Sequence, residues 1–285
     1  MEHVQLKKIV EKIQKLPTLP VVVTQVMRMV EDSATTAADI NRIISNDPSL
    51  SSKILKLVNS AFYGFPRRIS TVTQAIVILG FNTVKSLALS ASVFDVFKGK
   101  GSSFDRTAFW QHSIAVGVCS QIISKKVHYS KPEESFIAGI LHDIGKIALD
   151  QYAHEDFEEV LKTAESTNCS VIEAERKVLG ATHAQVGRWM ALKWNFPDNL
   201  LEPIAFHHSP QSAKTSPELA SMVHLSDILV KTMGIGSGGD NTVPALDPAA
   251  WRLLQLEKKD LENIMEELKN SIDKASAFLA LAQQA

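Results

Sequence analysis

The sequence contains few cysteines, because Cys119 and Cys169 are the only two among its 285 residues. They lack the spacing of a zinc site or a redox motif, and this usage is typical of a reducing compartment rather than of a disulfide-held fold. An excess of charge is also lacking, since 30 Lys and Arg residues stand against 31 Asp and Glu residues. The net charge of -1 gives the whole molecule no strong attraction to nucleic acid or to a membrane surface.

Long apolar runs are missing as well. No stretch approaches ~18 uninterrupted apolar residues, so we expect no membrane-spanning helix. The amino-terminal stretch MEHVQLKKIVEKIQKLP intersperses charged and apolar residues, which is typical of an amphipathic helix and not of a signal peptide. We therefore expect a cytoplasmic protein. Its 45% hydrophobic and 21% charged residues are ordinary for a globular chain of one large domain or two smaller ones.

Helical periodicity runs through almost the whole sequence and strand alternation is nearly absent, so we expect an all-α fold. Residues 35–62 are typical of two short helices that meet at Asp47 and Pro48, because proline disfavours helix in the residue before it. We expect three segments along the chain. They are an N-terminal helical subdomain at 1–100, a helical block at 101–233, and a flexible glycine-rich excursion followed by C-terminal helices at 234–285.

The run ILHDIGKIAL, residues 140–149, places His142 directly before Asp143 among aliphatic residues. We expect one helix that starts at a capping box of Ser130 and Glu133 and continues through the HDIGK motif. Adjacent residues lie about 100° apart around a helix, so both titratable side chains can reach one point beside it. The two glycines of this helix, which are unfavourable there, would suit the close approach of another backbone or of a ligand.

Four other segments of the middle block contribute inward histidines and aspartates. A capping box of Thr182 and Gln185 would set His183 in the first turn of its helix. The remaining members share helix faces with apolar residues or end a helix. They are His112, the adjacent pair His207 and His208, and Asp227.

A single inward histidine is more often a hydrogen-bonded core residue than a metal ligand. We give this interpretation to four histidines outside the group, namely His3, His128, His154 and His224. Five histidines and two aspartates inside one helical block are a different case. Buried imidazoles and carboxylates at that density need a multivalent cation to accept their lone pairs and offset their charge. The sequence therefore predicts a metal site.

The ligand types narrow the chemistry of this site. Imidazole and carboxylate without thiolate suit iron, manganese, zinc or nickel, and disfavour a calcium cage. Two such ions ~3.5 to 4 Å apart, bridged by a carboxylate, would lower the pKa of a bridging water and supply hydroxide near neutral pH. Lys146, one turn after His142, would either neutralise a phosphate oxygen or remain a solvated lysine at a helix end.

The motif HDIGK, with His112 upstream and Asp227 downstream, resembles the HD superfamily of metal-dependent phosphohydrolases, whose basic site is His, His-Asp, Asp. Three amino-terminal stretches resemble the HDOD domain more specifically: LPTLPVVV, IISNDPSLSSKILKLVNSAFYGFPRRIS and AIVILGFNTVKSLAL. The resemblance spans about residues 16–230. It implies an all-α fold, in which an N-terminal helical subdomain packs on an HD-type helical bundle, and a role in bacterial signal transduction.

Similarity to the related HD-GYP phosphodiesterases implies a ligand set for each of two ions. The ligands implied for the first are His112, His142, Asp143 and Asp227. Those implied for the second are His183, His207 and His208, with Asp143 bridging. The cofactor expected from the resemblance is a pair of divalent transition-metal ions, iron or manganese before zinc or nickel.

Two departures from the HD-GYP pattern limit what the resemblance implies. After the paired histidines the chain reads HHSPQSAKTSP, without the acidic residue and the glycine-tyrosine-proline signature of that family. Hydrolysis of cyclic di-GMP is therefore not implied. Ala108 stands one turn before His112, where trinuclear members carry an acidic residue, so we expect no third ion.

Three functions stay open. The favoured one is a regulatory HDOD protein whose metal centre is structural or senses a nucleotide-type ligand, with output through a signalling partner. The second is a metal-dependent phosphohydrolase acting on a nucleotide or cyclic dinucleotide, with Asp143 and Lys146 in catalysis. The third and least favoured is nucleic-acid binding by the basic excess of residues 53–100, where seven Lys and Arg residues face only Asp95. An apolar stripe on the terminal helix would pack on its own domain or form a homodimer.

Overall fold

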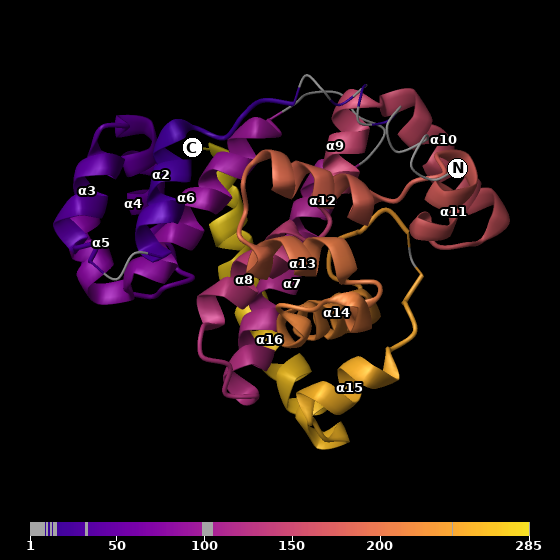
Figure 1. Ribbon diagram of the computed structural model, residues 1–285. Helices are drawn as coiled ribbons and strands as arrows, with labels where there is room; N and C mark the ends of the chain where they lie inside the picture. The colour runs from indigo at the N-terminus through magenta and orange to yellow at the C-terminus, as the bar shows by residue number, and fades with distance from the viewer. Residues whose placement is uncertain are drawn as a thin grey trace. The chain divides into compact units, whose positions relative to one another are not determined.

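The computed structural model describes residues 9, 11, 13, 16–31, 34–98, 105–240 and 242–284. Within these ranges the regular elements are all helices and no residue forms a strand, so the expected all-α fold is confirmed (Figure 1). His3 and residues 99–104 lie outside the described residues. No helix of the described chain is long and apolar enough to cross a membrane.

The chain divides into two compact units. The first comprises the described residues of Met1–Pro17 and Gly99–Lys269, and the second those of Thr18–Lys98 and Asn270–Ala285. The terminal helix α16 (Lys258–Gln284) has residues in both. The five other helices of the second unit are α2 (Val21–Glu31), α3 (Ala37–Ser45), α4 (Pro48–Val58), α5 (Val72–Leu79) and α6 (Phe81–Val96).

Local signals explain where the helices of the second unit begin. The hydroxyl of Thr36 accepts the backbone N–H of Asp39, and the Asp39 carboxylate accepts the N–H of Thr36, which makes a complete capping box for α3. Asp47 caps α4 by accepting the N–H of Leu50, with Pro48 as the first helical residue. The expected pair of helices meeting at Asp47 and Pro48 is thereby confirmed.

The first unit carries the histidine-rich block. Its helices are α7 (Arg106–Lys126), α8 (Pro132–Leu141), α9 (Ile144–Tyr152), α10 (His154–Thr167), α11 (Val171–Val178), α12 (His183–Lys193), α13 (Asp198–Phe206), the short 3-10 turn η2 (Pro210–Ser212), α14 (Pro217–Thr232), α15 (Pro248–Leu254) and the start of α16. Helices α7, α8 and α14 pack together, and α12 lies against both α9 and α13.

Glycines allow the central helices of this unit to approach closely. A Cβ atom on Gly139 of α8 would lie 2.6 Å from the Cα of Gly117 in α7. A Cβ atom on Gly145 of α9 would lie 2.0 Å from the carbonyl oxygen of His183 in α12. The two glycines of the HDIGK region therefore serve the close approach of another backbone, as one of the two sequence-based interpretations held.

The expected continuous helix through the HDIGK motif is wrong, because α8 ends at Leu141 and α9 starts at Ile144. His142 and Asp143 form the turn between them, and the Asp143 side chain makes no capping hydrogen bond. The capping box of Ser130 and Glu133 is also absent, since Lys131 occupies the cap position without a side-chain bond. Asp143 is therefore held in a turn between two helices and not inside one helix.

The segment between α14 and α15, residues 233–247, forms no helix in its described residues, which are turns and bends as far as 240 and irregular chain from 242; we call it the strap (Figure 1). Its described residues are tied down along its length. The Ser237 N–H donates to the Ala108 carbonyl oxygen at 3.0 Å, and the Asp247 N–H donates to His224 Nε2 at 3.0 Å. The strap therefore joins α7 and α14 on the side of the molecule where the histidines gather.

Candidate metal centre

The structure brings all seven predicted metal-site residues together. They come from α7, the turn between α8 and α9, the start of α12, the end of α13 and the middle of α14. Six are buried and His208 is half-buried. The six are His112, His142, Asp143, His183, His207 and Asp227.

One group of donors forms where α7 and α14 meet the HDIGK turn. Donor atoms of His112, His142 and Asp143 all lie within 4.8 Å of one another. Asp227 adjoins them, because its Oδ1 lies 3.1 Å from His112 Nε2 and 3.9 Å from His142 Nε2. Ligands at about 2.0 to 2.2 Å from an ion lie at most about 4.4 Å apart, so this spacing is close to that of a coordination sphere.

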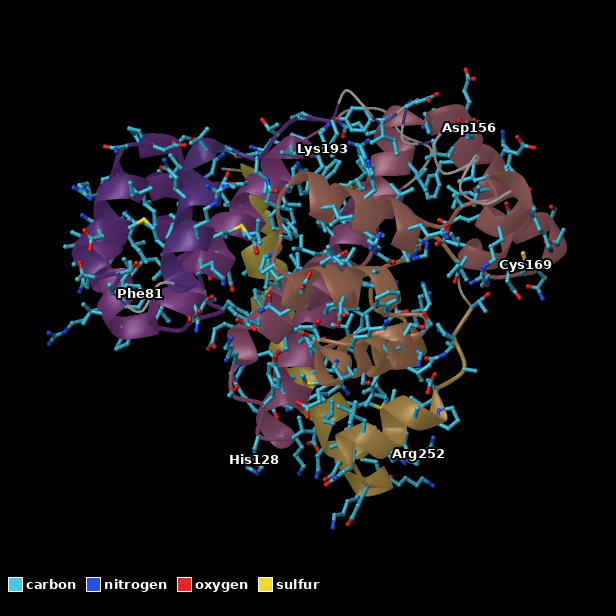
Figure 2. All side chains as sticks on the ribbon, viewed as in Figure 1. Phe81, His128, Asp156, Cys169, Lys193 and Arg252 are labelled. Carbon is cyan, nitrogen blue, oxygen red and sulfur yellow. The ribbon has the colours of Figure 1, made fainter. Side chains whose placement is uncertain are left out.

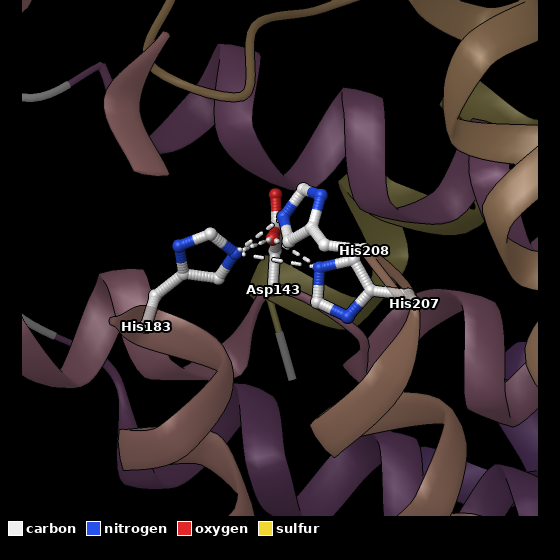
Figure 3. Close-up of side chains that lie close together, drawn as sticks. All are labelled: Asp143, His183, His207 and His208. Carbon is white, nitrogen blue, oxygen red and sulfur yellow. Dashed lines mark hydrogen bonds and ion pairs between the residues drawn. The ribbon is translucent and has the colours of Figure 1, made fainter. Parts of the chain in front are cut away.

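A second group forms on the other side of the same aspartate (Figure 3). The Oδ1 atom of Asp143 lies 3.1 Å from His183 Nε2 and 3.4 Å from His207 Nε2. His208 completes the group, with its Nε2 atom 3.0 Å from that of His183. Asp143 belongs to both groups, since its other oxygen, Oδ2, lies 3.3 Å from His142 Nε2.

The outer nitrogens of three rings fix the direction of the inner ones. The Nδ1 atom of His142 lies 2.7 Å from the carbonyl oxygen of Gly139, and that of His207 lies 3.1 Å from the carbonyl oxygen of Ile204. His183 Nδ1 lies 2.7 Å from a carboxylate oxygen of Glu175. These acceptors require a hydrogen on Nδ1, which leaves a lone pair on each Nε2 that points into the cluster.

Several buried polar atoms at the centre make no hydrogen bond within the described chain. They are Nδ1 and Nε2 of His112, Nε2 of His142, Oδ1 of Asp143 and Oδ1 of Asp227. Buried polar atoms are hydrogen-bonded in the great majority of cases, so such a concentration needs a cause. Apart from His112 Nδ1, these are the atoms a cation would engage, and the donor set of imidazole and carboxylate fits a divalent transition metal.

The aspartate charges are strongly favoured in this environment. Burial alone would raise the pKa of Asp143, but its electrostatic interactions with the neighbouring His142 ring and the Lys146 ammonium group outweigh burial and hold that pKa well below its ordinary value. Burial opposes ionisation of Asp227 in the same way, and Lys231 is the main group that holds its pKa well below the usual range. Both carboxylates are therefore anionic near neutral pH, as metal ligands must be.

Most histidines of the cluster are held neutral. Burial lowers the pKa of His112, lowers that of His207 to about 4, and lowers that of His208 well below its ordinary value. His183 differs, because the Glu175 carboxylate outweighs burial and raises its pKa. A neutral imidazole offers the lone pair that a metal ion binds.

Lys146 is buried and not the solvated lysine of the alternative interpretation, with 1% of its surface exposed. Its Nζ atom lies 2.6 Å from Oδ2 of Asp143. Burial would lower the pKa of this amine, but the charges of Asp143 and Asp227 raise it. Lys146 is thus a fixed positive charge against the carboxylate shared by the two groups.

Sequence reasoning missed three charged residues around the cluster: Glu175, Lys231 and Asp240. Lys231 lies one turn after Asp227 on α14, and its Nζ atom is 4.0 Å from Oδ2 of Asp227. That spacing was the one available signal, since i,i+4 residues share a helix face. Glu175 and Asp240 are distant in sequence from the residues they serve, and nothing in the local pattern marks them.

The four histidines interpreted as core residues differ from one another. His224 is buried, with Nδ1 2.7 Å from the His207 carbonyl oxygen, so that prediction is confirmed. His128 and His154 are exposed, which makes the core interpretation wrong for both; Figure 2 shows His128 at the surface. His128 lies in the turn after α7, and His154 is the first residue of α10. At such helix ends, apolar neighbours in the sequence do not imply burial. His3 lies outside the described residues.

The fold and the cluster define an all-α protein with a buried histidine and aspartate centre of the HD type. The chain belongs to the HDOD domain family, whose model matches residues 16–210, and is thereby related to the HD superfamily. The match covers Thr18–Lys98 of the second unit and the first unit as far as residue 210, which includes the His207 and His208 pair but not Asp227.

Two curated relatives match parts of the chain. An uncharacterized protein of Treponema pallidum is 24% identical over 225 residues, which are 78% of this chain and 44% of that protein. The uncharacterized protein YuxH of Bacillus subtilis is 27% identical over 123 residues, 43% of this chain and 28% of its own length. The alignments thus span less than half the length of either relative.

Solved structures resemble the chain over nearly its whole length. An HDOD domain protein of unknown function from Geobacter sulfurreducens has a TM-score of 0.83 at 21% identity, covering 96% of this chain and 95% of that one. A protein described as a candidate phosphohydrolase from Shewanella amazonensis has a TM-score of 0.76 at 24% identity, covering 96% and 97%. At these identities the likeness shows the fold.

Proposed function

We propose that this protein is a regulatory HDOD protein whose histidine and aspartate cluster binds two divalent transition-metal ions, and whose metal centre senses a ligand and controls contact with a signalling partner. The observation that carries the proposal is the convergence of buried imidazole lone pairs and carboxylate oxygens that make no hydrogen bond of their own. Without a cation, that arrangement would cost several kcal/mol in unsatisfied polar atoms.

The two groups of donors support two ions that share Asp143. His112, His142 and Asp227 would hold the first with it. The second would be held by His183, His207 and His208. Iron or manganese suits this set of imidazole and carboxylate best, and zinc or nickel is compatible with it.

Burial of the centre favours a regulator over an open active site. His142 and His183 are fully buried, and the strap lies across the same face of the cluster. In a centre enclosed in this way, ligand binding would change the conformation of the elements that cover it. The element with two conformations would here be the strap. Nucleic-acid binding by the second unit has less support than its sequence suggested, although Lys56, Arg67 and Arg68 are exposed. There Lys85 is buried, and Lys53 and Lys98 both pair with Asp95.

A second candidate function, phosphohydrolysis, is favoured by one specific feature. A cavity of about 340 Å³ is lined by Lys146, His183 and His208, so a ligand in it would reach the second group of donors. Bound ions would lower the pKa of a coordinated water. Lys146 would offset charge on a phosphate oxygen, and Asp143 would hold both ions in place.

One preparation tests the proposal. Elemental analysis of the purified protein should find one to two equivalents of transition metal per chain, and the Asp143→Ala variant should lose both. Incubation with nucleoside phosphates, cyclic dinucleotides and an aryl phosphodiester then separates the two functions. Turnover by the iron- or manganese-loaded protein that Asp143→Ala abolishes would establish the hydrolase. Full metal loading without turnover supports the regulator, and metal near zero contradicts both.

A further inference from the structure

The strap covers the metal-site cluster at close range. A Cβ atom on Gly236 would lie 2.3 Å from the backbone nitrogen of His112, and the positive φ of +65° at this residue also favours glycine. A Cβ atom on Gly238 would lie 3.5 Å from Lys146 Nζ and 3.6 Å from Asp143 Oδ2. The strap backbone therefore passes tightly against α7 at Gly236, where a side chain would not fit, and comes close to the carboxylate that the two donor groups share at Gly238.

Asp240 lies further along the strap, and two backbone N–H groups and one lysine contact its carboxylate. Its Oδ2 atom accepts the backbone N–H of Val171, the first residue of α11, at 2.7 Å. Its Oδ1 atom lies 3.5 Å from Lys231 Nζ and accepts the N–H of Thr242 at 2.9 Å. The side chains of Asp240 and Lys231 are each only 8% exposed, so this is a buried charge contact and not a surface pair.

The Asp240 carboxylate lines the cavity of about 340 Å³ that reaches the metal-site cluster. The same cavity is lined by Lys146, Lys231, His183 and His208, with the exposed Arg176 as a further cation. Its volume is at the lower end of the range of small-molecule sites, which is roughly 300 to 1,000 Å³. It therefore suits a compact anion rather than a large dinucleotide.

Helix N-terminal N–H groups and lysine ammonium groups are the donors that bind phosphate in proteins. The Asp240 carboxylate, which belongs to the strap, contacts donors of this kind in the place that a phosphate would take. Two buried lysines converge on the cavity, and charge in this number is costly unless anions compensate it. The buried carboxylates of Asp143, Asp227 and Asp240 do so here, and the exposed Glu173 also lines the cavity. Of the three buried ones only Asp240 lies on the strap, which could move without unfolding a helix.

We propose that the cavity binds a phosphoryl group between Lys231 and the first N–H of α11, and that the Asp240 carboxylate holds this position until the ligand displaces it. The inference rests on the proposed function, because the phosphoryl group would lie beside the metal ions of the second donor group. It adds the ligand class and the residue that competes with it. Displacement of Asp240 would release the strap from α11, which supplies the movement that a sensing centre requires.

The test is phosphate binding by the intact protein, measured by isothermal titration calorimetry at fixed ionic strength with inorganic phosphate and with phenyl phosphate. Asp240→Asn removes the competing charge and should tighten phosphate binding by about tenfold. A factor of this size corresponds to roughly one charge-assisted hydrogen bond that the competing side chain no longer makes. Lys231→Met, combined with Asp240→Asn, should remove the gain. Asp198→Asn, which neutralises an exposed aspartate at the start of α13, is the matched control and should leave the affinity unchanged.

Each binding measurement is made on manganese-loaded and on chelated protein, with circular dichroism as the check on folding and Asp240→Ser as a second variant. The ratio of the phosphate affinity of the variant to that of the parent protein tests the phosphoryl site. The metal content of the same samples tests the proposed function. Full metal with no gain in either Asp240 variant would overturn the phosphoryl site alone. Absent metal with a tenfold gain that Lys231→Met removes would overturn the proposed function alone. Tightening for phenyl phosphate but not for inorganic phosphate would assign the site to phosphomonoesters.

Discussion

One carboxylate oxygen of Glu175 holds His183 twice, because Oε2 lies 2.7 Å from the ring Nδ1 and accepts the backbone N–H at 2.9 Å. The pair is buried, and the backbone contact fixes the first residue of α12 while the ring contact aims Nε2 at Asp143. A carboxylate behind a metal-bound histidine typically fixes the ring and raises its basicity. Glu175 is therefore the residue that prepares His183 to act as a ligand.

The first prediction concerns this pair. Glu175→Gln keeps an oxygen for the backbone N–H but removes the charge that raises the pKa of His183. We expect metal affinity at the second donor group to fall roughly tenfold to a hundredfold. Competition with a chromophoric chelator measures it, and Glu262→Gln on the exposed face of α16 is the matched control. Equal metal retention by the two variants would exclude a role for Glu175 in the metal site.

The second prediction concerns acid stability of the chelated protein. The pKa of His207 falls from 6.5 to about 4 on folding, so the unfolded chain binds more protons between those values. Stability must then drop as pH falls through that window, by about 2 kcal/mol for this residue near pH 5. Urea unfolding of chelated protein at about pH 7 and about pH 5 measures the difference. His207→Gln should reduce the difference, and an unchanged difference would contradict the assignment of a neutral buried ring.

The third prediction concerns the buried pair of Lys146 and Asp143. Lys146→Met fits the same space but leaves the Asp143 carboxylate without its nearest cation. In chelated protein we expect a loss of about 3 to 5 kcal/mol in the free energy of unfolding, and a smaller loss when metal is bound. Lys162→Met, which breaks the exposed pair with Glu158, should cause little change. A loss that is identical with and without metal would show that Lys146 does not share its carboxylate with an ion.

The fourth prediction concerns the contact of α9 with α12. Gly145→Ala would improve helix propensity but would place a methyl group 2.0 Å from the His183 carbonyl oxygen. We expect a loss of about 1 to 3 kcal/mol or more from overpacking, together with weaker metal binding because His183 would shift. Gly234→Ala has open space around its Cβ and isolates the effect of backbone conformation. Wild-type stability in Gly145→Ala would mean that the two helices do not approach as closely as described.

The members of the cluster could be predicted from the sequence because each lies at a recognisable place, whereas their role as metal ligands stays a prediction. Helical periodicity put His112 and Asp227 on inward faces, and the Thr182 capping box that sets His183 at the start of α12 is present with Gln185. Seven such residues in one block were enough to predict a cluster. The local signals did not predict the break after Leu141, because neither a proline nor a glycine stands between the two helices.

The surroundings of the cluster could not be predicted in this way. Glu175 and Asp240 reach their partners through tertiary packing, and a glycine-rich stretch such as the strap indicates only a loop without showing what it covers. The sequence also left open whether Lys146 was solvated. A lysine near the start of a helix has the same sequence neighbours whether its side chain is solvated or buried. The burial of Lys146 in the folded unit answered the question.

The proposed function requires two ions that share the Asp143 carboxylate. Anomalous difference maps from crystals, collected on either side of the iron and manganese absorption edges, locate such ions directly. We predict two peaks about 3.5 to 4 Å apart, one beside His112 and His142 and the other beside His183 and His207, with the carboxylate between them. Crystals of freshly purified protein that show no anomalous peak within the cluster, with those side chains in the same positions, would contradict it.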